Sequence, residues 1–168
     1  MLLPAEKLLA RVRELAQEID RHYGGREIVM VTVLKGAFVF AGDLIRHLKT
    51  PVKIDFICLE SYGDGKCSRH EIRARFDLAE QVENREVLIV EDIIDTGCSL
   101  DFLLTHLYEL GAADVKTCAL LNKLSRREVD VEPDWVGFII PDVFVVGYGI
   151  DYAQHYRNLP DICVLGDD

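Results

Sequence analysis

The sequence predicts a single α/β domain over residues 1–168, with a central, mainly parallel sheet flanked by helices. Short apolar segments rich in β-branched residues alternate with amphipathic helical segments, and no linker, repeat or low-complexity stretch interrupts them. The length of 168 residues also fits one domain with a substantial core. Because ligands bind beyond the carboxyl ends of parallel strands, we expect the functional residues there.

The first half of the chain alternates between helix and strand. Residues 5–22 place apolar side chains on one helical face, and Gly24-Gly25 follows as a stop signal. The pattern then predicts a strand, a helix and a second strand, at 27–34, 36–48 and 52–59. Residues 60–70 carry two glycines and no apolar period, which predicts a long loop of the kind that often has a function.

The second half continues the alternation. It is expected to hold a strand at 86–91 and a leucine-striped helix at 100–110 that ends at Gly111. Three further strands are expected at 115–121, 135–140 and 143–148. The last stretch is expected to form a small flap or hood over the sheet.

Composition excludes several classes of protein. The net charge of −10 argues against nucleic acid as the main partner, because duplex binding needs a basic face. It does not argue against a phosphate ligand, which backbone amides, two lysines and a metal can hold locally. No apolar run approaches the roughly 18 residues of a membrane span, and Met1–Arg11 lacks a signal-peptide pattern. We therefore expect a cytoplasmic protein with no membrane partner.

Five cysteines stand at positions 58, 67, 98, 118 and 163. Their number is odd, and no pair has the C-x-x-C spacing. This pattern predicts free thiols in a reducing compartment, with neither a disulfide framework nor a zinc site.

The segment Val87–Leu100, VLIVEDIIDTGCSL, holds the clearest candidate site. Four apolar residues predict a buried strand, and carboxylates then follow at Glu91, Asp92 and Asp95. Small and hydroxylated residues lead into the next helix, whose N-terminal amides suit a phosphomonoester: Thr96, Gly97, Cys98 and Ser99. The carboxylates suit sugar hydroxyls and a hydrated Mg²⁺. The polyphosphate signature G-x-x-x-x-G-K-[ST] is absent, so a sugar phosphate fits better. The alternative is a buried strand with solvated acids at its end.

This segment resembles the phosphoribosyl-pyrophosphate (PRPP) binding motif of the type I phosphoribosyltransferases. Four more segments in the family's order narrow the resemblance to the hypoxanthine(-guanine) branch: VTVLKGAF (31–38), ESYG (60–63), LLNK (120–123) and PDVFVVGYGIDYAQHYRNLP (141–160). The resemblance implies the type I phosphoribosyltransferase fold, with a small hood from terminal segments. It also implies transfer of the 5-phosphoribosyl group from PRPP to N9 of a 6-oxopurine, with Mg²⁺, giving IMP or GMP and pyrophosphate. The chain looks like the short bacterial form.

The resemblance assigns roles around the ribose and its phosphate. Asp95 is expected to handle the purine proton near N7, although the residues alone also allow an N-cap of the following helix. Glu91 and Asp92 are expected to hold the ribose hydroxyls and the first Mg²⁺, and Asp151 a second one. Residues 95–99 are expected to form the 5′-phosphate cradle.

Two further sets of residues take their roles from the same resemblance. The set expected to contact pyrophosphate is Lys35, Gly36 and Arg157, and the Leu34–Lys35 bond is cis in some members of the family. In the purine pocket, Lys123 would read O6, Phe144 would stack on the base and Val145 would offer backbone groups. Asp151 belongs to this pocket as well. Without the resemblance, Phe144 is a core aromatic and Lys35 a surface lysine.

Other features are expected to modify this site. Ser61 and Tyr62 resemble the family's lid, which would exclude water, and are otherwise a surface loop. Cys98 stands where lysine is frequent, Ser99 where threonine is common and Val143 where some members carry lysine. Contacts made by backbone amides survive the first two changes. Near a helix N-terminus the Cys98 thiol either has a lowered pKa or is unremarkable.

Two other functions remain open from the sequence alone. One is a regulatory protein that keeps the PRPP fold and binds RNA or DNA, against which the net charge of −10 argues. The other is a phosphoribosyltransferase for a different base, against which Lys123 and Phe144 argue; the preference among hypoxanthine, guanine and xanthine stays open. The resemblance implies a homodimer or homotetramer, in which residues 38–40 would face either an interface or the core.

Overall fold

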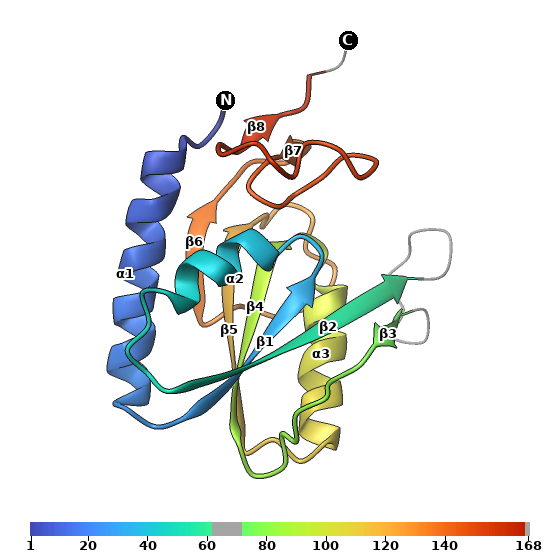
Figure 1. Ribbon diagram of the computed structural model, residues 1–168. Coiled ribbons are helices and arrows are strands. Elements are labelled where there is room, and N and C mark those ends of the chain that lie inside the picture. The colour runs from blue at the N-terminus through green and yellow to red at the C-terminus, as the bar shows by residue number, and fades with distance from the viewer. Residues whose placement is uncertain (62–71, 167–168) are drawn as a thin grey trace.

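The computed structural model describes residues 1–61 and 72–166 and contains a six-stranded central sheet (Figure 1). The strands lie in the order β3-β2-β1-β4-β5-β6, and all neighbours are parallel except β2 and β3. In chain order they are β1 (Ile28–Leu34), β2 (Val52–Ser61), β3 (Ile72–Phe76), β4 (Glu86–Ile94), β5 (Asp114–Asn122) and β6 (Trp135–Ile139). The predicted α/β fold with a mainly parallel sheet is confirmed.

Helices cover both faces of this sheet. Successive residues of a strand point to opposite faces, so Ile28 and Met30 of β1 join a core with α1 (Ala5–Tyr23) and α2 (Phe38–Ile45). Val29 and Val31 join a second core with α3 (Cys98–Glu109) on the other face. The central strands are therefore buried on both sides, which explains their nearly continuous apolar sequences.

A small hood lies beyond the carboxyl ends of the strands, near both chain termini (Figure 1). Its two-residue strands β7 (Val145–Val146) and β8 (Cys163–Val164) pair antiparallel. The N-terminal segment joins it through a bridge between Leu3 and Ile162. The expectation of a hood built from terminal segments is therefore confirmed.

Several elements differ from the sequence expectation. Residues 35–37 form a turn, so that α2 begins at Phe38 and not at Gly36. β4 continues to Ile94, which places Glu91 and Asp92 inside the strand. The strand expected over 143–148 shortens to β7, because the chain turns through left-handed conformations at Gly147 and Tyr148. β3 was not expected: it is a short, mostly exposed edge strand.

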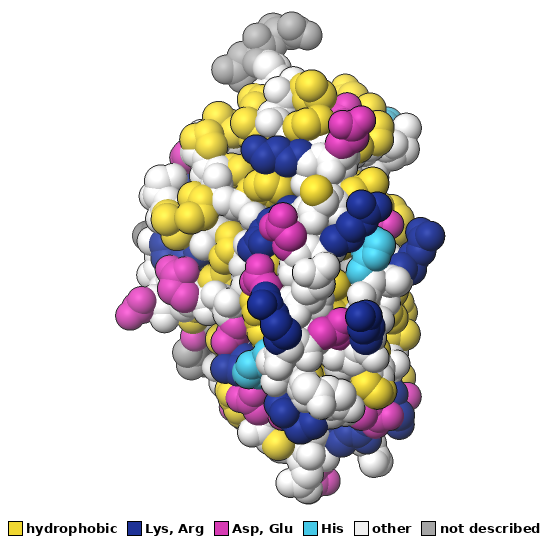
Figure 2. Space-filling model, turned by 90° about the vertical axis from the view of Figure 1, so that its left-hand side faces the viewer, with side chains coloured by type: hydrophobic (Ala, Val, Ile, Leu, Met, Phe, Trp, Pro, Cys, Tyr) yellow, Lys and Arg dark blue, Asp and Glu magenta, His cyan; other side chains and the backbone are white. Residues whose placement is uncertain are grey.

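The exposed surface of α1 carries charges of both signs. Figure 2 shows Lys and Arg side chains interspersed with Asp and Glu over this face of the molecule. Arg11 is an example, since its Nη1 lies 2.9 Å from carboxylate oxygens of both Glu14 and Glu18. In the part of the chain that is described, no helix combines the length and apolar character required to cross a bilayer.

Candidate active site

The carboxyl ends of the parallel strands bring the predicted site residues to one edge of the sheet. β1 leads into Lys35 and Gly36, β4 into Asp95 and the following loop, and β5 into Lys123. The segment after β6, which contains Phe144, Asp151 and Arg157, belongs to the hood beyond the same edge (Figure 1), and its Gln154 contacts Lys35. Sequence positions more than 100 residues apart therefore contribute to one site.

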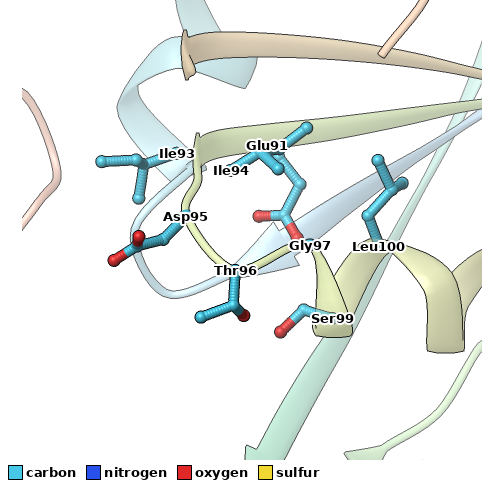
Figure 3. A pocket seen from close by; sticks show the side chains of 8 residues that line it. All are labelled: Glu91, Ile93, Ile94, Asp95, Thr96, Gly97, Ser99 and Leu100. Atoms are coloured by element: carbon cyan, nitrogen blue, oxygen red, sulfur yellow. The ribbon is translucent and has the colours of Figure 1, made fainter. Parts of the chain in front are cut away.

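The loop after β4 forms a small hollow of about 90 Å³, lined by Glu91, Ile93, Ile94, Asp95, Thr96, Gly97, Ser99 and Leu100. Figure 3 shows the Thr96 and Ser99 side chains on the same side of the loop with their hydroxyls turned toward each other, while the Asp95 carboxylate points away from them. Gly97 has φ 91°, which glycine adopts freely, and α3 starts at the next residue with no side-chain cap. The amides at the start of α3 thus face an open anion site, and Asp95 is not the N-cap of this helix.

Cys98 differs from the expectation of free thiols, because its sulfur is part of a disulfide. Cys58, Cys118 and Cys163 are free thiols as predicted. The Thr96 hydroxyl lies 3.0 Å from the Cys98 sulfur and accepts a hydrogen bond from the Cys98 amide at 3.4 Å. Cys98 thus belongs to the cradle loop through its backbone, and the idea of a reactive thiol there is wrong for this state of the protein.

Glu91 and Asp92 are an acidic pair at the end of β4. Burial raises the pKa of Glu91 well above its usual range, and the charge of Asp92 and a hydrogen bond with it raise this pKa further. Burial also raises the pKa of Asp92 to about 6, although backbone hydrogen bonds and the charge of Arg157 oppose this shift. Two neighbouring carboxyl groups of this kind can accept hydrogen bonds from hydroxyl groups, and a bound cation would favour their ionised forms.

Asp92 lies directly against the turn that follows β1. A Cβ atom on Gly36 would overlap the Asp92 carboxylate, and a Cβ atom on Gly149 would overlap the Gly36 carbonyl oxygen. The peptide bond between Leu34 and Lys35 is cis. The turn after β1 therefore meets the Asp92 side chain of β4 on one side and the backbone of the hood on the other, and a Cβ atom at either glycine would displace one of them.

The predicted pyrophosphate residues lie together on this side. Arg157 donates hydrogen bonds to the Gly149 carbonyl oxygen at 2.8 Å and to Gln154 Oε1 at 3.2 Å, and its Nη2 lies 2.8 Å from Asp151 Oδ1. Lys35 Nζ donates to the same Gln154 oxygen at 3.3 Å. Asp151 Oδ2 accepts a hydrogen bond from the backbone N–H of Gln154 at 2.7 Å. Gln154 thus contacts Lys35, Asp151 and Arg157, and it was not predicted from the sequence.

Asp95 and Lys123 face each other on the opposite side of the site. Lys123 Nζ lies 3.8 Å from Asp95 Oδ2 and 3.9 Å from Asp142 Oδ1, and the lysine side chain is only 6% exposed. Arg126 Nε lies 3.5 Å from Asp95 Oδ1, yet that buried oxygen has no hydrogen-bond partner among the described residues. The sequence did not single out Asp142 or Arg126. Asp95 therefore has one carboxylate oxygen that accepts no hydrogen bond from the described residues, close to the buried ammonium of Lys123.

Phe144 is exposed, although without the family resemblance the sequence would suggest a core residue. Its side chain is 51% exposed and packs edge-on against Tyr152, with ring centroids 5.6 Å apart. Val145 is buried, and its backbone belongs to the β7–β8 pair. The exposed ring of Phe144 is therefore available to a planar ligand.

Two predictions involve the remaining site residues. Ser61 ends β2, but Tyr62 lies outside the described residues, so the lid stays a prediction. Among the described residues, no group of three or more His, Cys, Asp or Glu side chains is arranged to hold a metal ion. The pair Glu91–Asp92 still fits Mg²⁺, because this ion is usually bound by one or two carboxylates, with water and substrate oxygens completing its shell.

Comparison with known proteins identifies the family. The sequence profile of the phosphoribosyl transferase domain matches residues 1–153. The chain belongs to the phosphoribosyltransferase family. A crystal structure of a hypoxanthine-guanine phosphoribosyltransferase from Bacillus anthracis, with HEPES in its active site, is 46% identical and has a TM-score of 0.95. The alignment covers 99% of this phosphoribosyltransferase chain and 98% of the Bacillus anthracis chain.

Curated relatives agree with this family. The hypoxanthine phosphoribosyltransferase of Haemophilus influenzae is 45% identical over 162 residues, which are 95% of this chain and 90% of that protein. The bifunctional protein TilS/HprT of Listeria monocytogenes is 44% identical over 165 residues, 98% of this chain. The present phosphoribosyltransferase chain spans 26% of that longer protein. The resemblance drawn from the sequence motifs is confirmed.

Proposed function

We propose that this chain transfers the 5-phosphoribosyl group from PRPP to N9 of hypoxanthine, and also of guanine, and releases pyrophosphate. The observation that carries the proposal is the position of Asp95, which lies between the phosphate cradle and the buried ammonium of Lys123. Along one edge of the sheet, this site has an anion cradle, then a carboxylate, then a cation. In a nucleoside monophosphate, the phosphate would lie in the cradle and the purine base beside the carboxylate and the cation. The names of the relatives support the same reaction.

The chemistry requires proton handling at the base and charge stabilisation at the sugar. The N–C bond forms at C1 of the ribose as the bond to pyrophosphate breaks, through a transition state with oxocarbenium character. Asp95 would accept the purine proton or stabilise the protonated ring, and its Oδ1, which accepts no hydrogen bond from the described residues, is the acceptor for this purpose. Lys35 and Arg157 would stabilise the charge on the departing pyrophosphate.

Base selection would depend on Lys123 and Phe144. The Lys123 ammonium only donates hydrogen bonds, so it suits the O6 acceptor of a 6-oxopurine and would face a second donor on adenine. Phe144 would stack on the base with its exposed face, and Val145 backbone groups would contact the base edge. Asp151 would lie beside this pocket.

Magnesium is the cofactor that the acidic residues fit. Glu91 and Asp92 would hold the ribose hydroxyls and, through them or water, the first Mg²⁺, and Asp151 would hold the second. When bound, the ions would neutralise charge on the pyrophosphate group. The raised pKa values of Glu91 and Asp92 support this role, since a neighbouring cation relieves the repulsion between the pair.

We also propose that the enzyme works in the cytoplasm as a homodimer or homotetramer. Of the residues considered for an interface, Phe40 is buried in the core, whereas Phe38 is 48% exposed. Phe38 and Val39 line an apolar hollow of about 420 Å³ with hood residues. This surface supports an interface at Phe38 and Val39, and Phe40 does not contribute to it.

The test is an assay with PRPP, Mg²⁺ and each of hypoxanthine, guanine, xanthine and adenine, with nucleotide products separated by chromatography. We expect IMP and GMP and no AMP. The Lys123→Ala variant should lose preference for 6-oxopurines over adenine, whereas Lys116→Ala, near the opposite end of β5, should keep it. Formation of no nucleotide from hypoxanthine or guanine would refute the proposed function.

A further inference from the structure

Arg127 lies behind the phosphate cradle, on the side of Gly97 away from the hollow. A Cβ atom on Gly97 would lie 3.1 Å from both Arg127 Cδ and Arg127 Nη1, and 2.9 Å from Val131 Cγ2. Arg127 is absent from the residues that line the hollow itself. The guanidinium therefore packs against the backbone of the cradle loop without entering the ligand space.

The charge of this guanidinium is poorly compensated. Arg127 Nη2 donates a hydrogen bond to Asn122 Oδ1 of β5, and Asn122 is itself buried. Arg127 Nε and Nη1 are inaccessible to solvent, and neither has a hydrogen-bond acceptor within the described ranges. No carboxylate in these ranges forms an ion pair with Arg127, although neighbouring Arg126 pairs with Asp95 and Asp142. A buried cation of this kind costs free energy unless an anion offsets it.

Among the described residues, the cradle has no cation of its own. Its lining contains the carboxylates of Glu91 and Asp95 and no described Lys or Arg. A phosphate dianion placed there would be held by backbone amides and the Thr96 and Ser99 hydroxyls, with no cationic side chain in the lining to balance its charge. Arg127, packed against Gly97, supplies the positive charge that this balance requires.

The segment around Arg127 also fixes the shape of the cradle loop. The amides of Glu128 and Val129 donate hydrogen bonds to the Thr96 carbonyl oxygen at 2.9 and 3.3 Å. These two hydrogen bonds tie the cradle loop at Thr96 to the backbone that follows Arg127. The side chain of Arg127 and the backbone that follows it thus act on the same two residues, Thr96 and Gly97.

We propose that Arg127 is a positioning residue for the 5′-phosphate of the substrate: it holds the Thr96–Gly97 turn in place and supplies fixed positive charge behind it. The inference rests on the proposed function, because the phosphate belongs to PRPP and to the nucleotide product. Arg127 does not touch the reacting atoms, so its removal should affect phosphate binding more than turnover.

The experiment compares Arg127→Met, which keeps the length and removes the charge, with Arg127→Lys, which keeps the charge. For Arg127→Met we expect KM for PRPP to rise about tenfold or more with kcat changed less than about threefold, the scale of one charge-assisted contact. Calorimetry should show the same loss of affinity for IMP and an unchanged affinity for pyrophosphate, which lacks the 5′-phosphate. Arg127→Lys should recover most of the loss, and Arg13→Met, an exposed arginine on α1, should match the wild type.

The outcomes separate the two proposals. A wild-type protein that makes no IMP refutes the proposed function. An active wild type with unchanged KM for PRPP in Arg127→Met, or with equal losses for IMP and pyrophosphate, refutes the role of Arg127. If Arg127→Met does not fold, Arg127→Gln removes the charge while keeping a donor for Asn122, and the same affinities decide the question.

Discussion

The two ends of the site, the phosphate cradle and the pyrophosphate side, are built from the chain in different ways. The cradle is one continuous segment, Glu91–Leu100, in which a strand end, a glycine turn and a helix N-terminus follow one another. The pyrophosphate side combines the β1 turn, Asp92 of β4 and the hood, joined through Gln154 and Arg157. The first end depends on local backbone shape, and the second on how three segments pack.

This difference has a consequence for function. A change in the cradle should act at the ribose phosphate and the base, whereas a change on the pyrophosphate side should act through the packing of the hood. Ligands that contain only one end of the substrate distinguish the two effects: IMP for the cradle and pyrophosphate for the hood side.

The largest effect is expected from Asp95→Asn at the end of the cradle. Loss of the carboxylate removes the proton acceptor while keeping its size, so kcat should fall by about 10²- to 10³-fold. The affinities for PRPP and pyrophosphate should change little, because the cradle amides and the hood are untouched. Steady-state kinetics and calorimetry measure both quantities. Near-wild-type turnover would show that another residue handles the purine proton.

A second prediction concerns Gly149→Ala on the pyrophosphate side. The added methyl group would overlap the Gly36 carbonyl oxygen, and Gly149 has φ 100°, a conformation that alanine disfavours. We expect a loss of about 2–4 kcal/mol in the free energy of unfolding, and a pyrophosphate affinity reduced at least about tenfold, with a smaller change for IMP. Urea unfolding and calorimetry give these values.

Gly42 of α2 provides the matched control for this substitution. A Cβ atom there meets no atom within 4 Å, so Gly42→Ala should be neutral or more stable by up to about 1 kcal/mol. Equal effects of the two substitutions would contradict the close contact between the hood and the β1 turn.

The same contrast explains what the sequence could predict. The cradle was predictable because its chemistry lies within contiguous residues, from the apolar strand through Glu91 and Asp95 to the turn at Gly97. Gln154 was not, because its importance depends on Lys35 and Arg157 approaching it in the folded chain. For Phe144 the apolar pattern alone would suggest a core aromatic, because periodicity cannot show which hood residues are exposed, and its predicted role in stacking came only from the family resemblance. The edge strand β3 was missed because exposed strands lack an apolar signature.

The smallest effect is expected from Asp92, which both ends of the site share. Its pKa is raised to about 6 in the folded protein, against about 4 in an unfolded chain. The protonated form is therefore favoured by folding: this contribution to stability is complete below about pH 4 and is lost as the pH rises through 6. The raised pKa of Glu91 acts in the same direction. The ligand-free protein should lose stability between about pH 4 and 6 on account of Asp92.

Asp92→Asn tests this assignment because the amide is neutral at every pH and matches the carboxyl group in size. We expect the variant to gain about 1–2 kcal/mol over the wild type at pH 8 and almost nothing at pH 4. It should also bind PRPP more weakly, because the proposed ligand of the ribose and of Mg²⁺ is lost. Urea titrations from pH 4 to 8 measure the difference. A gain that does not depend on pH would mean that packing against Gly36, and not ionisation, sets the stability at this position. A stabilised variant that no longer binds PRPP would show that the repulsion between Glu91 and Asp92 is kept for substrate binding at the expense of stability.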